Sequence, residues 1–483
     1  MKTFRIYSVI ELRKFYKLTF TFHILTGSHP PQSPRARQSI LTFSILVSLF
    51  FGTSILSAQS AKPNVIFILS DDQGWGDAGV YGATDILTPN IDRIAKNGIR
   101  FTQFYANAPV CSPSRAAILT GKTPLNAGVP GNIASIAGQT NGMPASEVTM
   151  AEMFKSNGYQ TAAIGKWHLG YTDALQPGGQ GFDYQFGHLV GCIDNYSHFY
   201  YWRGPNRHDL YQNGKEIFRD GSYFPAMCYE EASQFMTANQ QEPFFIYYAM
   251  NSPHYPYQGS DKWNKYYREK GIPYPRNLYG AFVSTFDEYV GKLLDKLEQL
   301  NLAQNTIVIF QSDHGHSTEE RAHFGGGSAG PFRGAKGSLY EGGLRVPAII
   351  SWPGRIKSGE VRNQWAIASD WYPTLADLCG LSMPEHPIDG SSLINIITNA
   401  HAPEIHESWH WNFGKHWSVR KGKWKLLYDP LDTTLKRNPE PNAPEDQFFL
   451  VNLEEDPGEK INLAESYPEM VDELKQLYHL RKN

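Results

Sequence analysis

Residues 64–74 read NVIFILSDDQG, and this stretch decides the fold class. Its apolar residues Val65–Leu69 form an unbroken run, which is typical of a strand buried on both faces of a parallel sheet. A long amphipathic helix is expected at about 279–300, and further apolar runs occur at 161–164, 244–249 and 306–310. Alternating strands and helices predict an α/β fold with a large mixed, mainly parallel sheet sandwiched by helices.

The pattern of expected helices and strands changes after about residue 400. Short strands are expected at 416–420 and 424–428, followed by an acidic stretch at 452–459 and a final helix from Pro468. We therefore predict a main α/β domain at 62–400 and a smaller C-terminal α+β domain at 401–483.

The N-terminal segment differs in charge from the rest of the chain. Residues 1–58 carry seven Lys and Arg against one Glu, so the overall net charge of −3 combines +6 here with −9 elsewhere. This basic leader runs into the apolar stretch 40–56 and the small residues before Gln59, a pattern typical of a signal peptide cleaved near Ala58. The alternative is a retained membrane anchor, for which about 20 apolar residues are needed. We expect a periplasmic or secreted protein without a stable membrane anchor.

Composition excludes several function classes. With 41% hydrophobic residues in 483, the chain has enough apolar material to fold, which excludes disorder for most of it. No domain-wide basic excess exists, so nucleic-acid binding is not expected. The four cysteines, none in CxxC spacing, argue against a disulfide scaffold and against a thiolate zinc site.

Acids and histidines follow the predicted strands. Asp71-Asp72 come after the first strand, Asp313-His314 after the strand at 306–310, and His254 after the strand at 244–249. Ligand sites in open α/β sheets lie beyond these carboxyl ends. Clustered carboxylates repel one another unless a cation lies between them, and such oxygen ligands suit Ca²⁺ or Mg²⁺ better than zinc. His314 is either a ligand or a contact to the reacting group.

A second feature is Cys111-Ser112-Pro113-Ser114-Arg115, which leads into a short apolar helix ending at Gly121. The proline and glycine positions place Cys111 at or just before a helix N-terminus, where a thiol pKa falls and anions are favoured. A lone cysteine would be read as a small buried apolar residue. The Cys-x-Pro-Ser-Arg context instead matches the signature recognised by formylglycine-generating enzymes.

From about Pro63 to the C-terminus the chain resembles the type I, formylglycine-dependent sulfatases, which are arylsulfatase-like members of the alkaline-phosphatase superfamily. The motifs that carry the resemblance occur in order along the chain: Asp71–Gly74, Cys111–Arg115 with Leu119–Lys122, Gly165–Gly170, Ser252–His254, Asp313–Gly315, Gly334–Ser338 and the tail segment Asn452–Glu459.

The resemblance implies a modified residue and a metal. Cys111 would be oxidised by a formylglycine-generating maturation enzyme to formylglycine (3-oxoalanine), whose hydrate is the nucleophile. One Ca²⁺ would be held by Asp71, Asp72, Cys111, Asp313 and His314. Many relatives have Asn where His314 stands, so this ligand departs from the commonest pattern. The metal would polarise a sulfate oxygen and acidify the hydrate.

The resemblance also assigns roles to the remaining residues. Arg115 would steady the hydrate, and Lys166 and Lys336 would clamp sulfate oxygens, because the transition state spreads negative charge over them. His254 would protonate the leaving oxygen. His168 would be the base that expels sulfate and regenerates the aldehyde. Without the family, the two lysines would be read as exposed; Lys122 is either a support for the Cys111 loop or a surface cation, and Trp167 is expected to pack.

The segment 188–211 is the candidate substrate region. Its aromatic rings stand beside cations and amides, which suits stacking on sugars and pairing with further anionic groups, although an ordinary packed loop has the same composition. Its notable residues are Asp194, Asn195, Tyr196, His198, Tyr200, Tyr201, Trp202, Arg203, Arg207 and His208. Weaker candidates for the pocket rim are 323–327 and 410–416. A disulfide between Cys192 and Cys228 is compatible with the sequence but not established by it.

The sequence therefore predicts an exported, calcium-dependent sulfatase acting on a sulfated carbohydrate, such as an oligosaccharide derived from a polysaccharide. One alternative is a phosphate or phosphonate monoester hydrolase of the same superfamily, since the same nucleophile and metal serve phosphoryl transfer. The other is a non-catalytic protein that binds sulfated glycans.

Overall fold

The computed structural model describes residues 62–136, 138–202, 204–435 and 447–482, all within the unit Ala61–Asn483. The expected signal segment 1–58 lies outside the described residues. Among the helices of the described part, none is long and apolar enough to cross a membrane.

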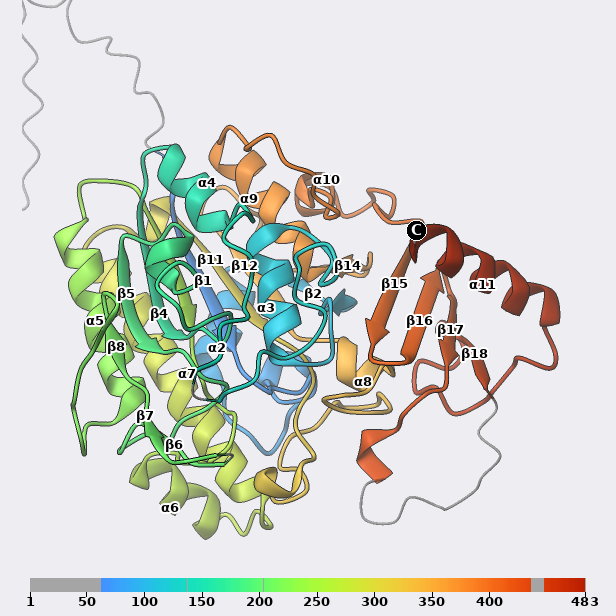
Figure 1. Ribbon diagram of the computed structural model, residues 1–483, viewed down its shortest axis with the longest axis horizontal. Coiled ribbons are helices and arrows are strands. Elements are labelled where there is room, and N and C mark those ends of the chain that lie inside the picture. Colours follow the sequence, from blue (N-terminus) through green and yellow to red (C-terminus); the bar gives the residue numbers. More distant parts are fainter. Residues whose placement is uncertain (1–61, 137, 203, 436–446, 483) are drawn as a thin grey trace, which may run out of the picture. The chain divides into compact units, whose positions relative to one another are not determined.

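A large mixed sheet organises the main domain (Figure 1). The central strand β1 (Asn64–Ser70) lies parallel to β10 on one side and to β11 on the other, and β4 and β5 continue the parallel part. Within the described residues the order of its ten strands is β13 (Glu360–Arg362), β2 (Gly98–Phe101), β12 (Ala348–Ser351), β11 (Thr306–Ser312), β1, β10 (Phe244–Ala249), β4 (Gln160–Lys166), β5 (Tyr184–His188), β8 (Tyr211–Gln212) and β9 (Lys215–Glu216). The mixed, mainly parallel sheet predicted from the apolar runs is confirmed.

Helices cover both faces of this sheet, as the apolar runs require (Figure 1). Helices α3, α4, α9 and α10 pack on one face, and α2, α5 and α7 pack on the other. The helices are α2 (Pro89–Lys96), α3 (Cys111–Thr120), α4 (Met150–Ser156), α5 (Phe224–Ala238), α6 (Asp261–Glu269), α7 (Arg276–Gln299), α8 (Glu341–Leu344), α9 (Trp371–Cys379), α10 (Ile394–Thr398) and α11 (Pro468–Lys482).

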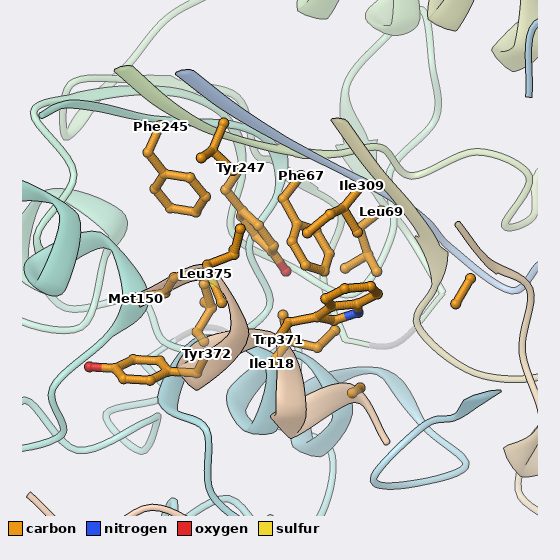
Figure 2. Close-up of a cluster of buried hydrophobic side chains, with 14 of the residues drawn as sticks. Phe67, Leu69, Ile118, Met150, Phe245, Tyr247, Ile309, Trp371, Tyr372 and Leu375 are labelled. Atoms are coloured by element: carbon orange, nitrogen blue, oxygen red, sulfur yellow. The ribbon is translucent and has the colours of Figure 1, made fainter. Parts of the chain in front are cut away.

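Alternate residues of β1 supply two separate cores. Phe67 and Leu69 point to the α3/α9 face, where Phe67 meets Trp371 edge-on with ring centroids 6.4 Å apart (Figure 2). Ile66 and Ile68 point to the opposite face. All residues of β1 are buried. Close packing in both cores therefore holds this strand in place and fixes the position of the acids that follow it.

The C-terminal region forms a small antiparallel sheet of its own (Figure 1). Its strands are β15 (Ser408–Phe413), β16 (His416–Lys421), β17 (Trp424–Tyr428) and β18 (Phe448–Asn452), and α11 packs on β16 and β17. A buried ion cluster ties it to the main domain: Lys425 Nζ lies 2.9 Å from Glu341 Oε1 and 2.9 Å from Glu459 Oε1. The expected small α+β domain is confirmed, while its boundary at residue 400 stays a prediction.

Short pairings complete the fold. Strands β3 (Phe104–Tyr105) and β14 (Ala366–Ile367) pair in parallel, and β6 (Phe199–Tyr200) and β7 (Arg207–His208) form an antiparallel hairpin. The hairpin lies in the candidate substrate region, so that region has a defined backbone rather than being an open loop.

Candidate active site

Parallel strands bring the predicted acids to one edge of the sheet. Ser70 of β1 is in register with Ser312 of β11, so Asp71-Asp72 and Asp313-His314 leave the sheet side by side. Lys166 ends β4, and His254 follows β10 on the other side of β1. The residues that the sequence placed at separate strand ends therefore meet, and all of them are buried.

Cys111 is the first residue of α3, as predicted, and its side chain faces the acids. The sulfur lies 3.8 Å from Asp71 Oδ1 and 3.3 Å from His314 Nε2. Burial raises the pKa of the Cys111 thiol, but Lys166 and Lys336 outweigh burial and hold that pKa well below its ordinary value. An anionic group is therefore favoured at this position.

Three cations surround the carboxylates. Lys166 Nζ is 2.7 Å from Asp71 Oδ2, and Lys336 Nζ is 3.0 Å from Asp72 Oδ2. Arg115 has no solvent exposure: its guanidinium donates to Asp313 Oδ2 at 3.0 Å and to the Lys166 carbonyl at 3.1 Å. Arg115 thus ties two strand ends together.

These cations do not fully offset the cost of burying the charged carboxylates. Burial raises the pKa of Asp72 to about 8 and that of Asp313 to about 6. Burial also opposes ionisation of Asp71, but Lys166 and the other nearby cations hold its pKa well below its usual range. Asp72 Oδ1 is buried and accepts no hydrogen bond. A buried carboxylate oxygen without a donor is unfavourable unless a cation binds it, so this set fits a hard divalent ion.

His314 presents one defined nitrogen to this cluster. Its Nδ1 lies 2.9 Å from the Gly315 carbonyl, which can only accept, so Nδ1 donates and Nε2 faces the acids. Nε2 is 3.3 Å from Asp72 Oδ1 and 3.6 Å from Asp313 Oδ1. Burial lowers the pKa of His314, but Asp313 and Cys111 outweigh it and raise the pKa to about 9. A proton at Nε2 here occupies the place that a metal ion would take.

The ligand atoms are close enough to share one ion. In two overlapping groups, all ligand atoms lie within 4.8 Å of one another: Asp71, Cys111, Asp313 and His314 in one, and Asp71, Asp72, Cys111 and His254 in the other. The donor set predicted from the sequence is thus assembled, with His254 as a further neighbour.

The other two histidines also have defined tautomers. His168 Nε2 donates to the Ile133 carbonyl at 2.9 Å, which leaves the buried Nδ1 without a hydrogen bond. Burial lowers the pKa of His168, so this ring is a neutral base. His254 Nδ1 donates to the Tyr255 carbonyl at 2.7 Å, and its Nε2 accepts from Lys336 Nζ at 3.3 Å. Burial and Lys336 lower the pKa of His254 to about 3.

Two of these residues hold strained backbone. Asp72 has a φ of 61° and His168 a φ of 60°, in the left-handed region that favours glycine. Each is the second residue after a strand, in the turn that carries the side chain into the site. Such strain persists only where the surrounding packing imposes it, and it is concentrated at functional sites.

Comparison with known proteins assigns the chain to a family. The Sulfatase family model matches residues 63–381, more than half of the chain. The chain belongs to the sulfatase family. A second family model, N-sulphoglucosamine sulphohydrolase, C-terminal, matches residues 334–483.

Individual relatives agree with this assignment. The sulfatase is 32% identical to human arylsulfatase A over 91% of this chain and 90% of the relative, and 35% identical to rat N-acetylgalactosamine-6-sulfatase over 74% and 70%. It is also similar to the crystal structure of Ps i-CgsB in complex with k-i-k-neocarrahexaose, with 30% identity and a TM-score of 0.76 over 86% of this chain and 92% of that one. The protein is accordingly a sulfuric ester hydrolase.

Two residues of this sulfatase site were not predicted. Glu319 Oε2 lies 3.4 Å from Lys336 Nζ and accepts a hydrogen bond from the Tyr255 hydroxyl at 3.1 Å. Tyr255 packs on His254 with ring centroids 4.0 Å apart. Tyr255 directly follows the Ser252–His254 motif, so it could have been predicted from the sequence. Glu319 follows Asp313-His314 by several residues, and no sequence motif around it indicates a role in the site.

The candidate substrate region divides into a buried and an exposed part. Tyr201 is exposed and stacks on Trp202 with centroids 4.3 Å apart, and Trp202 meets Tyr255 edge-on at 5.9 Å. This aromatic row connects the surface to His254. In contrast, Asn195 is buried and hydrogen-bonded to Gln258. Arg203 lies outside the described residues.

The remaining sequence predictions have mixed outcomes. Lys122 pairs with Glu147 Oε2 at 2.7 Å, and Trp167 is buried, donating from Nε1 to the Leu175 carbonyl at 2.8 Å. The two lysines at positions 166 and 336 are buried, so reading them as exposed would have been wrong. A Cβ at Gly337 would lie 3.9 Å from Phe413, so one end of the 410–416 segment adjoins the Lys336 loop. All four cysteines are free thiols, so the Cys192–Cys228 disulfide is not formed.

Proposed function

We propose that this protein is an exported, calcium-dependent sulfatase that hydrolyses sulfate esters of a sulfated carbohydrate and releases inorganic sulfate. The observation that carries the proposal is the placement of Cys111 at the start of α3, between Asp71 and His314 and within a ring of three buried cations. That pocket combines a position for a nucleophile with fixed positive charge, which is what a sulfate ester requires.

The proposal includes a modified residue and a metal. Cys111 is converted by a formylglycine-generating enzyme to formylglycine, whose hydrated form supplies the nucleophilic oxygen. Ca²⁺ is held by Asp71, Asp72, Asp313 and His314 together with the modified Cys111. When bound, the ion polarises a sulfate oxygen and acidifies the nucleophile. The unpaired Asp72 Oδ1 and the raised pKa values of Asp72 and Asp313 support this ligand set.

The cations bind and orient the ester. Lys166 and Lys336 reach into the site from opposite sides of the carboxylate pair Asp71-Asp72, so each can contact a non-bridging sulfate oxygen. Since both side chains are buried, their charges act in a medium of low dielectric, where they stabilise developing negative charge more strongly than in water. Arg115 acts indirectly, as a positioning residue, because its guanidinium is held by Asp313 and the Lys166 carbonyl.

The histidines move protons at defined atoms. His168 accepts a proton at Nδ1, the nitrogen left without a hydrogen bond in the structure. His254 delivers a proton from Nε2 to the leaving oxygen. Its pKa is low in the site without substrate because of burial and Lys336, and a bound sulfate monoanion adjacent to it raises that pKa towards the working range.

A carbohydrate substrate is supported by the aromatic row. Tyr201 is exposed and Trp202 partly buried on a path that ends at His254, and flat rings of this kind stack on the apolar faces of sugars. One relative is named for N-acetylgalactosamine, and one similar structure contains k-i-k-neocarrahexaose. Export through cleavage near Ala58 would place the enzyme where polymeric substrates are found.

The deciding experiment measures sulfate release from defined sulfated mono- and oligosaccharides by the wild type and by Cys111→Ala. Mass spectrometry of the peptide that contains residue 111 reports its conversion to formylglycine. Cys379→Ala is the matched control, because Cys379 is buried at the end of α9 and away from the acids. We expect sulfate release by the wild type and the control, and none by Cys111→Ala.

Three results would contradict the proposal. Undiminished sulfate release by Cys111→Ala would exclude this residue as the nucleophile. Faster turnover of an aryl phosphate or phosphonate than of the matching aryl sulfate would instead assign a phosphoryl monoester hydrolase. An unconverted Cys111 with intact glycan binding and no turnover would assign a binding protein. The intact mass of the exported chain, expected to begin near Gln59, tests export separately.

A further inference from the structure

Two buried histidines face each other in the hairpin segment, outside the catalytic cluster. His198 directly precedes β6, and His208 ends β7; their ring centroids are 6.1 Å apart and the rings are nearly perpendicular, at 86°. His198 has no solvent exposure and His208 has 7% (Figure 1 shows the hairpin). Both rings are buried, so at these two positions the packed-loop interpretation of the segment applies.

Hydrogen bonds fix the tautomer of each ring. His198 Nε2 lies 3.0 Å from the Ser222 carbonyl, which can only accept, so Nε2 carries the proton. His208 Nδ1 lies 2.9 Å from the Glu216 carboxylate and donates to it. The remaining nitrogens, Nδ1 of His198 and Nε2 of His208, are buried and have no hydrogen-bond partner.

A carboxylate completes the group. The exposed Asp220 brings a carboxylate oxygen to the two rings: this oxygen and one ring nitrogen of each histidine all lie within 4.8 Å of one another. Two buried ring nitrogens without donors, on rings that lie beside a carboxylate, are unfavourable unless a cation binds them. The backing of one ring by a carboxylate and of the other by a backbone carbonyl is the arrangement that orients metal-bound histidines.

We propose that His198, His208 and Asp220 form a second metal site that binds Zn²⁺. Two imidazole nitrogens and one carboxylate suit zinc, whereas Ca²⁺ and Mg²⁺ prefer oxygen ligands. Zinc bonds of about 2.0 Å require the ligand atoms to approach to roughly 3.3 Å. The exposed Asp220 can move to shorten its own two distances, and binding must also draw the two rings together. Because Asp220 is at the surface, a fourth position is open to water.

The ion acts as a clamp on the segment beside the catalytic centre. It joins the β6–β7 hairpin to the loop after β9, which carries Asp220. Asp209, the neighbour of His208, accepts hydrogen bonds from the backbone of Leu189 and Val190, and a Cβ at the next residue, Gly191, would lie 3.0 Å from the His168 ring. Zinc therefore stabilises the wall of the site without touching the reacting atoms.

The test measures Zn²⁺ binding to the full-length protein in excess Ca²⁺, by competition with a chelating dye and by metal analysis after gel filtration. We compare the wild type with His208→Gln and with Asp220→Asn, a surface variant that leaves the core intact. His401→Ala and Asp173→Asn are matched controls, because both side chains are exposed and belong to other segments. Asp313→Asn reports binding to the acidic catalytic cluster instead.

We expect one Zn²⁺ per chain in the wild type, in both controls and in Asp313→Asn. His208→Gln abolishes this binding, and Asp220→Asn weakens it at least ~10-fold. Zinc should also raise the Tm of the wild type but not that of His208→Gln. The proposal is overturned by a wild type that takes up no zinc, by variants that bind as the wild type does, or by loss of zinc only in Asp313→Asn.

Discussion

Replacing Lys425 by methionine should destabilise the protein through the ion cluster that joins the C-terminal sheet to the main domain. Lys425, Glu341 and Glu459 are all buried, and Lys425 Nζ lies 2.9 Å from a carboxylate oxygen of each acid. Methionine keeps the volume of the lysine stem and removes only the charge. Taking away one partner of a buried ion cluster costs about 3–5 kcal/mol of unfolding free energy, because a charge is left uncompensated.

The loss should depend on pH, because the two acids differ. Burial raises the pKa of Glu341, but Lys425 and Arg345 outweigh burial and lower that pKa to about 2. In the variant this acid keeps Arg345 at 3.3 Å and the Tyr105 hydroxyl at 2.6 Å. Burial already raises the pKa of Glu459 from 4.5 to about 7, and without Lys425 it rises further. When folding raises the pKa of an acid, its contribution to stability is fully present below its unfolded pKa of 4.5. The protein loses that contribution as the pH rises through the folded pKa.

In the wild type, the contribution of Glu459 to the free energy of unfolding therefore levels off above about pH 7. In the variant, the contribution of Glu459 keeps falling by about 1.4 kcal/mol per pH unit until the pH reaches its higher folded pKa. Urea unfolding followed by tryptophan fluorescence at pH 7 and pH 8 measures both curves. Lys423→Met is the control, since Lys423 is exposed in the same hairpin. A loss below about 1 kcal/mol at pH 8, or a difference that does not grow from pH 7 to pH 8, would refute this reasoning.

Three further predictions concern the site. Arg115→Lys should lower kcat by at least ~100-fold, because one ammonium cannot replace the paired contacts to Asp313 and the Lys166 carbonyl; steady-state kinetics on an aryl sulfate check this. Trp202→Ala should raise KM for a sulfated oligosaccharide about three- to tenfold and leave aryl sulfate turnover unchanged, so equal effects on both substrates would contradict a stacking role. Chelation should abolish sulfate release and Ca²⁺ should restore it, while circular dichroism shows that the chelated protein stays folded.

The sequence was most informative where strands are buried on both faces. The runs at β1, β10 and β11 are continuous and apolar, so their positions and parallel pairing could be predicted. Strand β12 is only four residues long and runs antiparallel, and β8 and β9 have two residues each. Such short segments carry too few residues for a periodic pattern, and distant partners decide their pairing.

The catalytic cluster was predictable because it follows strand ends and matches family motifs. Asp71, Cys111 and Asp313 meet as expected, but their contacts depend on the register of β1 with β11, which the sequence does not specify. Burial was the harder quantity: an aromatic loop has the same composition whether it faces solvent or packs inward, so the sequence left both interpretations open for the segment with His198 and His208.

The left-handed backbone at Asp72 and His168 lowers the stability of the folded protein. Each residue forgoes about 1–2 kcal/mol that glycine would recover in the same conformation. A His168→Gly protein would relieve this strain but would lose the buried ring and its hydrogen bond to the Ile133 carbonyl, so the strained turn and the packing around it depend on each other.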